Sequence, residues 1–285
     1  MIRALSVIGH GTNLLKHYIE HYQRYVDEIN LVVYESDLHR QLADEVSGII
    51  QQYPNVRIVK VVYERIFDWE KVTQLYNYIK KENPNDWWVI ADIDELHLYP
   101  EDDLKQLIID CESNNWDIVR GGFIDRIGPD GTFPEIKSDV SLWKQFPNAG
   151  FFRYPMSEAC PNKICVVKGY VEITSGQHYA KILNHTTWRW QGWNHPLIAP
   201  VPSYTVQVHH FKWDATSIER MRNVASTNQA YAYSEEYRKM YKEVSKTRKK
   251  IDLDDPEFMF ELGLDKPQYG RYKQWNKLIR KIITI

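Results

Sequence analysis

Little in this sequence points to a disulfide framework, a membrane span or a nucleic-acid-binding surface. The 3 cysteines, Cys111, Cys160 and Cys165, are odd in number and scattered, so they suggest neither a disulfide framework nor a zinc knuckle. Cys160 and Cys165 could pair, but reduced thiols are the simpler expectation. No apolar run approaches the roughly 20 residues that cross a bilayer, and no signal peptide is visible. The formal net charge of -2 gives no electrostatic basis for nucleic-acid binding. These absences favour a cytoplasmic protein.

Aromatic residues, in contrast, are plentiful, with 10 Trp and 19 Tyr. Their rings combine a flat apolar face with a polar edge, which suits the binding of carbohydrate or nucleobase rings, although core packing explains most of them by default. The densest group lies at residues 188–196. It predicts either a loop that stacks on sugars or an aromatic cluster beneath a long loop.

The first 120 residues alternate between strand-like and helix-like patterns, which predicts a mostly parallel sheet with right-handed crossovers. We expect strands at 4–8, 29–34, 56–63 and 87–91, and helices at 14–26, 38–53 and 69–81. The middle of the chain is richer in Gly, Pro and aromatic residues, with strands expected at 118–120, 151–153, 163–167 and 205–211. Residues 214–250 are charged and helical in pattern.

The most informative segment is the apolar run at residues 87–91, which ends at Asp92, Asp94 and Glu95. In an extended segment, residues two apart point to the same side, so Asp92 and Asp94 are expected to present their carboxylates together. Such charges need a cation or hydrogen-bond donors beside them. Oxygen ligands in an open site suit Mg²⁺ or Mn²⁺ with phosphates completing the shell, which indicates a diphosphate substrate.

A plainer interpretation treats Asp92 and Asp94 as loop acids that cap the next helix. The residues from Glu95 through Pro100 and the following acids are expected to start that helix. A helix that starts after the acids would place them at the carboxyl end of a strand. Open α/β sheets bind their ligands there, which favours the metal interpretation. The turn at residues 9–13 is not a dinucleotide fingerprint, which argues against a nicotinamide enzyme.

Three places in the chain resemble the glycosyltransferases of GT-A fold, specifically the family-2-like group with an Asp-x-Asp-Glu motif. They are the first strand with its turn and helix, residues 88–95, and residues 208–213, which look like the late histidine strand that closes the metal site. The resemblance covers residues 1 to about 215. It implies an α/β, GT-A-like (Rossmann-like) fold: a mixed, mostly parallel sheet flanked by helices, with a helical C-terminal extension.

The same resemblance implies a catalytic domain at residues 1–213, followed by the extension at 214–285. Residues 1–120 would form the nucleotide-sugar half and residues 121–213 the acceptor half. The basic, partly amphipathic tail at 269–285 could contact an anionic membrane surface or pack as a terminal helix.

The resemblance also implies which residues form the site, and each of them has a simpler structural explanation as an alternative. Mn²⁺ or Mg²⁺ would be bound by Asp92, Asp94 and His210. His210 and Val208 share one strand face and His209 the other, and a buried core histidine is the alternative for either. The donor, with UDP as the expected carrier, would meet Asn13, Glu35, Asp37, Arg65, Gln74 and Asp92. Ser36 or Asp37 could instead cap a helix, and Asn13, Arg65 and Gln74 could be surface residues.

An inverting transfer needs a base near the acceptor hydroxyl, whereas a retaining one does not. The candidates are Asp125, Glu158, Glu172 and His178, and each could equally be structural. Glu158 and His178 join Asp94 as the predicted catalytic residues. Glu158 lies in a turn-like segment, and His178 lies near Gly176, which permits close approach of a ligand.

The resemblance therefore implies a metal-dependent glycosyltransferase, a hexosyl- or pentosyltransferase. It would move a sugar from a nucleoside-diphosphate sugar to a hydroxyl of a glycan or lipid-linked acceptor. One alternative is a nucleotidyltransferase that forms the sugar nucleotide, although the turn at residues 9–13 lacks the basic residue that such enzymes place there. A non-catalytic carbohydrate-binding protein is the other alternative.

Overall fold

The computed structural model describes nine stretches of the chain, within two compact units. The stretches are 1–37, 39–66, 68–150, 156–157, 159–182, 185–186, 195–226, 234–247 and 250–254. The first unit comprises Met1–Gly121 and Asn162–Val208, and the second comprises Gly122–Pro161 and His209–Ile285. The division into domains at residue 213, with halves meeting at residue 120, stays a prediction.

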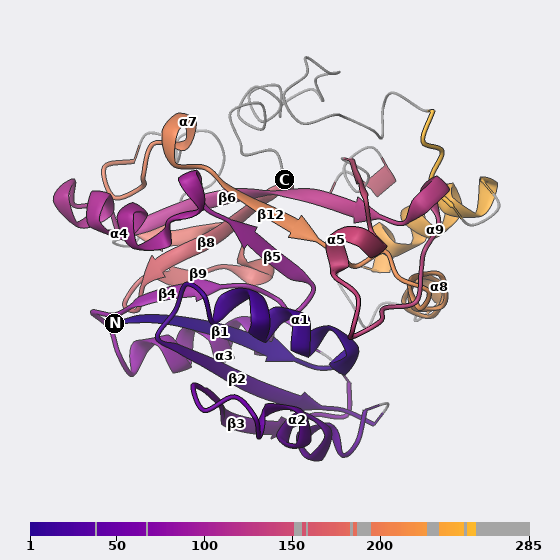
Figure 1. The fold of residues 1–285 in the computed structure, drawn as a ribbon, viewed down its shortest axis with the longest axis horizontal. Coiled ribbons are helices and arrows are strands. Elements are labelled where there is room, and N and C mark those ends of the chain that lie inside the picture. The colour runs from indigo at the N-terminus through magenta and orange to yellow at the C-terminus, as the bar shows by residue number, and fades with distance from the viewer. Residues whose placement is uncertain are drawn as a thin grey trace. The chain divides into compact units, whose positions relative to one another are not determined.

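The amino-terminal part of the first unit alternates strands and helices, as predicted (Figure 1). Its elements are β1 (Ile2–Ile8), α1 (Thr12–Tyr22), β2 (Glu28–Glu35), α2 (Leu42–Ile50), β3 (Val56–Tyr63), α3 (Trp69–Lys81) and β4 (Trp87–Ile90). Helix α3 has the predicted bounds because Asp68 caps it, accepting hydrogen bonds from the backbone N–H groups of Glu70 and Lys71.

The central sheet is mixed and mostly parallel, which confirms the predicted Rossmann-like, GT-A-type fold. Its strand order is β3-β2-β1-β4-β8-β6-β12-β5, with β7 paired to β6 off this path. The added strands are β5 (Glu95–Leu98), β6 (Ile118–Ile127), β7 (Asn148–Gly150), β8 (Asn162–Lys168) and β12 (Val206–His210). Strand β1 is parallel to β2 and β4, β2 is parallel to β3, and β8 is antiparallel to β4.

Shorter elements complete the described part of the fold. The helices are η1 (Pro100–Asp102), α4 (Leu104–Ser113), η2 (Pro129–Gly131), α5 (Leu142–Gln145), η3 (Ser175–Gln177) and α7 (Val201–Tyr204). A second sheet has the order β11-β10-β9, formed by His185–Thr186, Ala180–Ile182 and Glu172–Ile173. Among the helices that the structure describes, none is both long and apolar enough to cross a bilayer.

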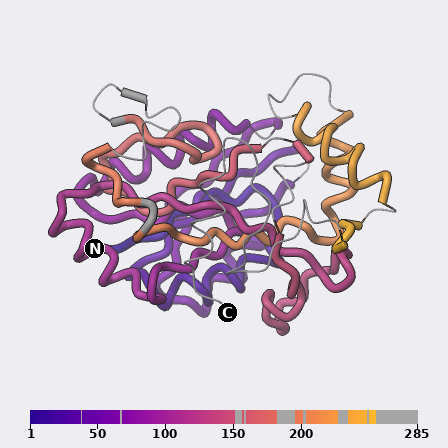
Figure 2. The backbone as a smooth tube through the Cα atoms, turned by 90° about the horizontal axis from the view of Figure 1, so that it is seen from above, coloured from indigo at the N-terminus to yellow at the C-terminus, as the bar shows by residue number. Residues whose placement is uncertain are grey.

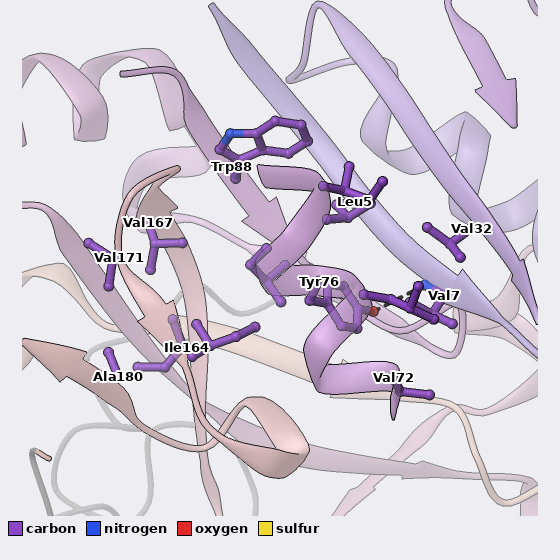
Figure 3. Packing of buried hydrophobic residues seen from close by; sticks show 14 of the residues in the cluster. Leu5, Val7, Val32, Val72, Tyr76, Trp88, Ile164, Val167, Val171 and Ala180 are labelled. Carbon is purple, nitrogen blue, oxygen red and sulfur yellow. Dashed lines mark hydrogen bonds between the residues drawn. The ribbon is translucent and has the colours of Figure 1, made fainter. Parts of the chain in front are cut away.

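The core of the first unit lies between α3 and the sheet (Figure 3). Val72 and Tyr76 of α3 pack in one cluster with Leu5, Val7 and other strand residues, which are fully or almost fully buried. The spacing of apolar residues on α3 follows one helical face, which is the pattern that buries a crossover helix on a sheet. This packing fixes α3, and with it Tyr76, beneath the end of β4.

The second unit has its own core, built around α8 (Ser217–Ser226) and α9 (Ser234–Lys246), which lie side by side in Figure 2. Met221 of α8 and Met240 of α9 pack in a cluster with Trp213. The charged, helical pattern predicted for residues 214–250 is confirmed for these two helices. The expected strand at 151–153 and the tail at 269–285 lie outside the described residues.

Several predicted elements differ from the structure in their bounds: the helix expected at 14–26 is Thr12–Tyr22, and the strand expected at 118–120 extends over Ile118–Ile127. Two further differences have a clear local cause. The helix expected at 38–53 begins only at Leu42, after Gln41 adopts the left-handed conformation with φ of 65°. Residues 95–98 form strand β5 instead of starting a helix, and α4 begins at Leu104 with Asp103 as its cap. Strand β5 neighbours β12, a partner more than one hundred residues away in the chain, and local patterns cannot report such pairing.

Candidate functional site

The acid motif lies where the strand order of the sheet changes direction. From β1 the chain adds β2 and then β3 on one side, and it returns with α3 to place β4 on the other side of β1. The loops that follow β1 and β4 therefore leave adjacent parallel strands at the same edge. If Gly11 carried a Cβ atom, that atom would lie 3.4 Å from Ile93 Cδ1. The two loops therefore lie within van der Waals contact of each other.

Residues 92–95 form a tight turn rather than an extended continuation of β4. The backbone N–H of Glu95 donates to the carbonyl of Asp92 at 3.0 Å, and the Asp92 N–H donates to Glu95 Oε2 at 3.2 Å. The expectation that Asp92 and Asp94 point together because the segment is extended is therefore wrong. The turn instead gives the three acids separate surroundings.

Lys163, from β8, lies against this turn. Its ammonium donates to Glu95 Oε1 at 2.8 Å, to Asp92 Oδ2 at 3.2 Å and to Gln177 Oε1 at 2.6 Å. The side chains of Lys163 and Glu95 are 1% and 2% exposed, whereas that of Asp92 is 22% exposed. Burial opposes the charge of Lys163, but Asp92 and Glu95 outweigh it and raise the pKa of the ammonium. The structure therefore holds a buried cation beside the acid motif.

The second oxygen of Asp92 is bound by α3. Tyr76 donates its hydroxyl hydrogen to Asp92 Oδ1 at 2.8 Å and accepts the Val7 N–H at 3.2 Å. Burial, followed by the charge of Asp92, raises the pKa of Tyr76 well above its usual value, so the phenol stays protonated. Asp92 is thus held between Tyr76 and Lys163.

Asp94, the middle acid of the turn, is partly exposed. Carboxylate oxygens of Asp94 and Glu95 come within 4.8 Å of one another. Carboxylate oxygens are the ligands that Mg²⁺ and Mn²⁺ prefer, so the Asp94 side of the turn offers donors of the kind that the implied metal needs. Asp92, with an ammonium on one oxygen and a phenol on the other, fits it poorly.

The acids at the end of β2 are bound to protein groups. Glu35 Oε1 accepts the Ala43 N–H at 3.0 Å and so caps α2, whereas the sequence offered Ser36 or Asp37 as the alternative for such a cap. Asp37 is exposed, and Oδ1 accepts hydrogen bonds from Tyr63 and Arg40, which lower its pKa. Their predicted contacts with the donor stay predictions.

The side chains of Asn13, Arg65 and Gln74 are all exposed, which agrees with the alternative that they are surface residues. Asn13 Oδ1 lies 3.9 Å from the position that a Cβ on Gly11 would take. Arg65 accepts the Asp37 N–H through its carbonyl oxygen at 3.4 Å. Their roles in donor binding are untested predictions.

The candidate bases are held in different surroundings. His178 Nδ1 lies 2.7 Å from the carbonyl oxygen of Asn162, and Glu172 forms ion pairs with Lys81 and Lys181. Glu158 lies outside the described residues, as does most of the aromatic loop at 188–196. The structure therefore assigns no base.

In the second unit, His210 and Asp125 form a buried pair. His210 Nδ1 lies 3.3 Å from Asp125 Oδ1, which also accepts a hydrogen bond from the Trp213 indole at 3.1 Å. His209 is buried and packs edge-on against Trp143. At this distance the Asp125 carboxylate can form an ion pair with the imidazole when His210 is protonated. The metal-binding role of His210 stays a prediction.

Sequence reasoning missed Lys163, Tyr76 and Gln177. The available signal was the lysine at the start of an apolar strand, because a charged side chain in a buried strand requires partners. Nothing local to Gln177 or Tyr76 marked them.

No protein-family model and no curated protein matches this sequence. One similar solved structure is a Bacillus anthracis protein named as a glucose-1-phosphate thymidylyltransferase, in complex with a sucrose. It aligns over 47% of this chain and 59% of its own, at 13% identity and a TM-score of 0.29. A 4-diphosphocytidyl-2C-methyl-D-erythritol synthase aligns over 59% of this chain and 75% of its own, at 15% identity and a TM-score of 0.30.

Both neighbours are enzymes whose names belong to the nucleotidyltransferase alternative rather than to glycosyl transfer. At these TM-scores, neither carries an argument about the activity of this chain.

Proposed function

We propose that this protein is a transferase that uses a nucleoside-diphosphate sugar as its donor. The observation that supports it best is the position of the acid turn. Asp94 follows β4 and Gly11 follows β1, at the point where the strand order reverses, and open α/β sheets bind ligands at the carboxyl ends of strands there.

In this proposal a carboxylate oxygen of Asp94 and one of Glu95 hold a divalent cation. The cation, when bound, would neutralise the departing diphosphate and orient it. The loop at residues 9–13 would approach the donor closely, because Gly11 has φ of 76° and no side chain to occupy the space beside Ile93. The acceptor would be a hydroxyl of a glycan or of a lipid-linked acceptor.

Glycosyl transfer is preferred over nucleotidyl transfer because of the same loop. A nucleotidyltransferase must bind a nucleoside triphosphate, and it usually places basic residues after its first strand for that purpose. Residues 9–13 contain no lysine or arginine. Formation of a sugar nucleotide, the alternative that the sequence leaves open, is the second candidate.

Product analysis separates these activities. The protein is incubated with Mn²⁺ in two mixtures, one with UDP-sugars and candidate acceptors and the other with nucleoside triphosphates and sugar 1-phosphates. We expect release of UDP in the first mixture and no pyrophosphate in the second. Pyrophosphate without UDP would establish nucleotidyl transfer instead.

The control for this assay is Asp94→Asn, which keeps the shape of the side chain and removes its charge. We expect it to abolish UDP release, whereas Asp139→Asn, an exposed acid of the second unit, should retain activity. Full activity in Asp94→Asn would reject the acid turn as the site.

A further inference from the structure

We propose that Tyr76 is a positioning residue of the proposed donor site: its hydroxyl joins β1 to Asp92 and so sets the spacing between the loop at residues 9–13 and the acid turn at residues 92–95. Tyr76 acts through Asp92 and through the backbone of β1 rather than by contact with the donor. This inference rests on the proposed function for the identity of the ligand, and it gives α3 a part in binding that ligand.

Strands β1 and β4 separate just before the acid turn. Their last paired residues are Leu5 and Ile90, and the Ala91 N–H donates to the Leu5 carbonyl oxygen at 3.4 Å. Strand β1 continues to Ile8 beside β2. Alternate residues of a strand direct their backbone groups to the same neighbour, so Val7, two residues after Leu5, directs its N–H to the side that β4 has left.

Tyr76 supplies the acceptor that β4 no longer provides there. Its hydroxyl oxygen accepts the Val7 N–H at 3.2 Å, and Figure 3 shows the side chain of Tyr76 reaching from α3 toward Val7. A backbone N–H that is buried without an acceptor destabilises a fold, and Val7 is buried. The phenol therefore takes the place of a carbonyl of β4 in the hydrogen bonding of β1.

The same hydroxyl group holds the acid turn. A phenol carries one hydrogen and can also accept a hydrogen bond. Because the oxygen accepts from Val7, the hydrogen is donated to Asp92 Oδ1, at 2.8 Å. The Asp92 N–H in turn donates to Glu95 Oε2, so the position of Asp92 is passed on to the end of the turn. One oxygen atom thus connects the backbone of β1 with the acid motif.

Tyr76 is a fixed point because α3 is anchored around it. The ring is fully buried, in one cluster with Val72 and Ile79 of the same helix. The next residue, Asn77, forms two hydrogen bonds with the backbone of Ile173: Nδ2 donates to the carbonyl oxygen and Oδ1 accepts the N–H, both at 2.9 Å. The phenol is therefore held in place, and the acid turn takes its position from the phenol.

The two loops that Tyr76 joins at their bases approach each other further along. Ile93 of the acid turn lies opposite Gly11, with its Cδ1 atom 3.4 Å from the position of a Cβ on Gly11. A ligand binds more tightly to two loops whose spacing is set before it arrives. Tyr76 therefore raises the affinity of the site for a nucleoside diphosphate without touching it.

Calorimetry of UDP in the presence of Mn²⁺ tests the positioning role with Tyr76→Phe, which removes only the hydroxyl group. Binding is measured at a temperature at which circular dichroism shows each variant to be folded. We expect Tyr76→Phe to weaken UDP binding by roughly 10-fold, the lower end of the loss when an outer-shell partner of a metal site is removed. An unchanged affinity would overturn the inference.

Tyr25→Phe is the matched control. Tyr25 is buried and also donates its hydroxyl hydrogen to a carboxylate, that of Asp102, whose side chain is 48% exposed. Each substitution removes a phenol that bonds to an acid, but of these two acids only Asp92 belongs to the turn. We expect Tyr25→Phe to lose stability and to keep the wild-type affinity for UDP. Equal weakening in both variants would reveal a general effect of lost stability and would also overturn the inference.

Hydrogen exchange of the Val7 amide, followed by nuclear magnetic resonance, tests the contact without any ligand. The Leu5 amide is the internal reference, since it lies on the same strand and reports the general stability of β1. In Tyr76→Phe we expect the exchange of Val7 to become faster by on the order of 10-fold relative to that of Leu5, because the Val7 N–H loses its acceptor. An unchanged ratio would contradict the role of the phenol in joining β1 to the turn.

The inference and the proposed function can fail separately. A wild type that binds no UDP with Mn²⁺ would reject the proposed function and, with it, the positioning role. A wild type that binds UDP, together with a Tyr76→Phe variant that binds it equally well, would reject the positioning role alone.

Discussion

At the scale of single residues, two buried tyrosines allow a direct comparison. Tyr76 and Tyr22 both accept a backbone N–H, but Tyr76 donates to the Asp92 carboxylate at 2.8 Å and Tyr22 to the Glu95 carbonyl at 3.0 Å. Hydrogen bonds to charged groups contribute more than neutral ones. In urea denaturation, Tyr76→Phe should lose about 2–3 kcal/mol of unfolding free energy and Tyr22→Phe about 1–2 kcal/mol. Equal losses would mean that Asp92 is not held by Tyr76 in solution.

The residues of the site divide into those that the sequence could reveal and those that it could not. Asp92 and Asp94 were predictable because they interrupt a buried strand. Lys163 is 71 residues away from Asp92, and it meets the motif only because β8 pairs with β4. The turn at residues 92–95 was also hidden, since it depends on hydrogen bonds of Glu95 rather than on a glycine or proline signal.

At the scale of elements, strand β6 shows how closely the sheet is packed. A Cβ on Gly121 would lie 2.4 Å from Cys165 Sγ and 2.5 Å from the Val206 carbonyl oxygen, whereas one on Gly48 of α2 would meet nothing within 4 Å. Gly121→Ala should therefore destabilise the protein by about 3 kcal/mol or more. Gly48→Ala should stabilise it by about 0.5–1 kcal/mol, measured by the same denaturant titration. A neutral Gly121→Ala would contradict the described position of β6.

Elements were predictable where local signals agree with the fold. Helix α3 and strand β3 have the predicted bounds because a cap or turn residue stands at their ends. Strand β5 was missed because its four residues pair with a distant strand. Helix α2 was predicted too long because residues 38–41 read as helical although Gln41 leaves the helical conformation.

At the scale of the whole molecule, the alternation of strands and helices was sufficient to predict the fold class. Periodicity reports which face of each element is buried, and crossover rules then limit the sheet to few arrangements. The division into two compact units was not predictable, since each unit combines segments from distant parts of the chain. The position of the acid turn at the change of strand order follows from the topology and supports the proposed function.

The central claim is that the acid turn binds a nucleoside diphosphate through a divalent cation at Asp94. Isothermal titration calorimetry of UDP in the presence and absence of Mn²⁺ tests it most directly. We expect binding that requires Mn²⁺ and that Asp94→Asn weakens by roughly 10-fold or more, with Asp139→Asn as the unaffected control. UDP affinity that is the same with and without Mn²⁺, and the same in Asp94→Asn, would contradict the account.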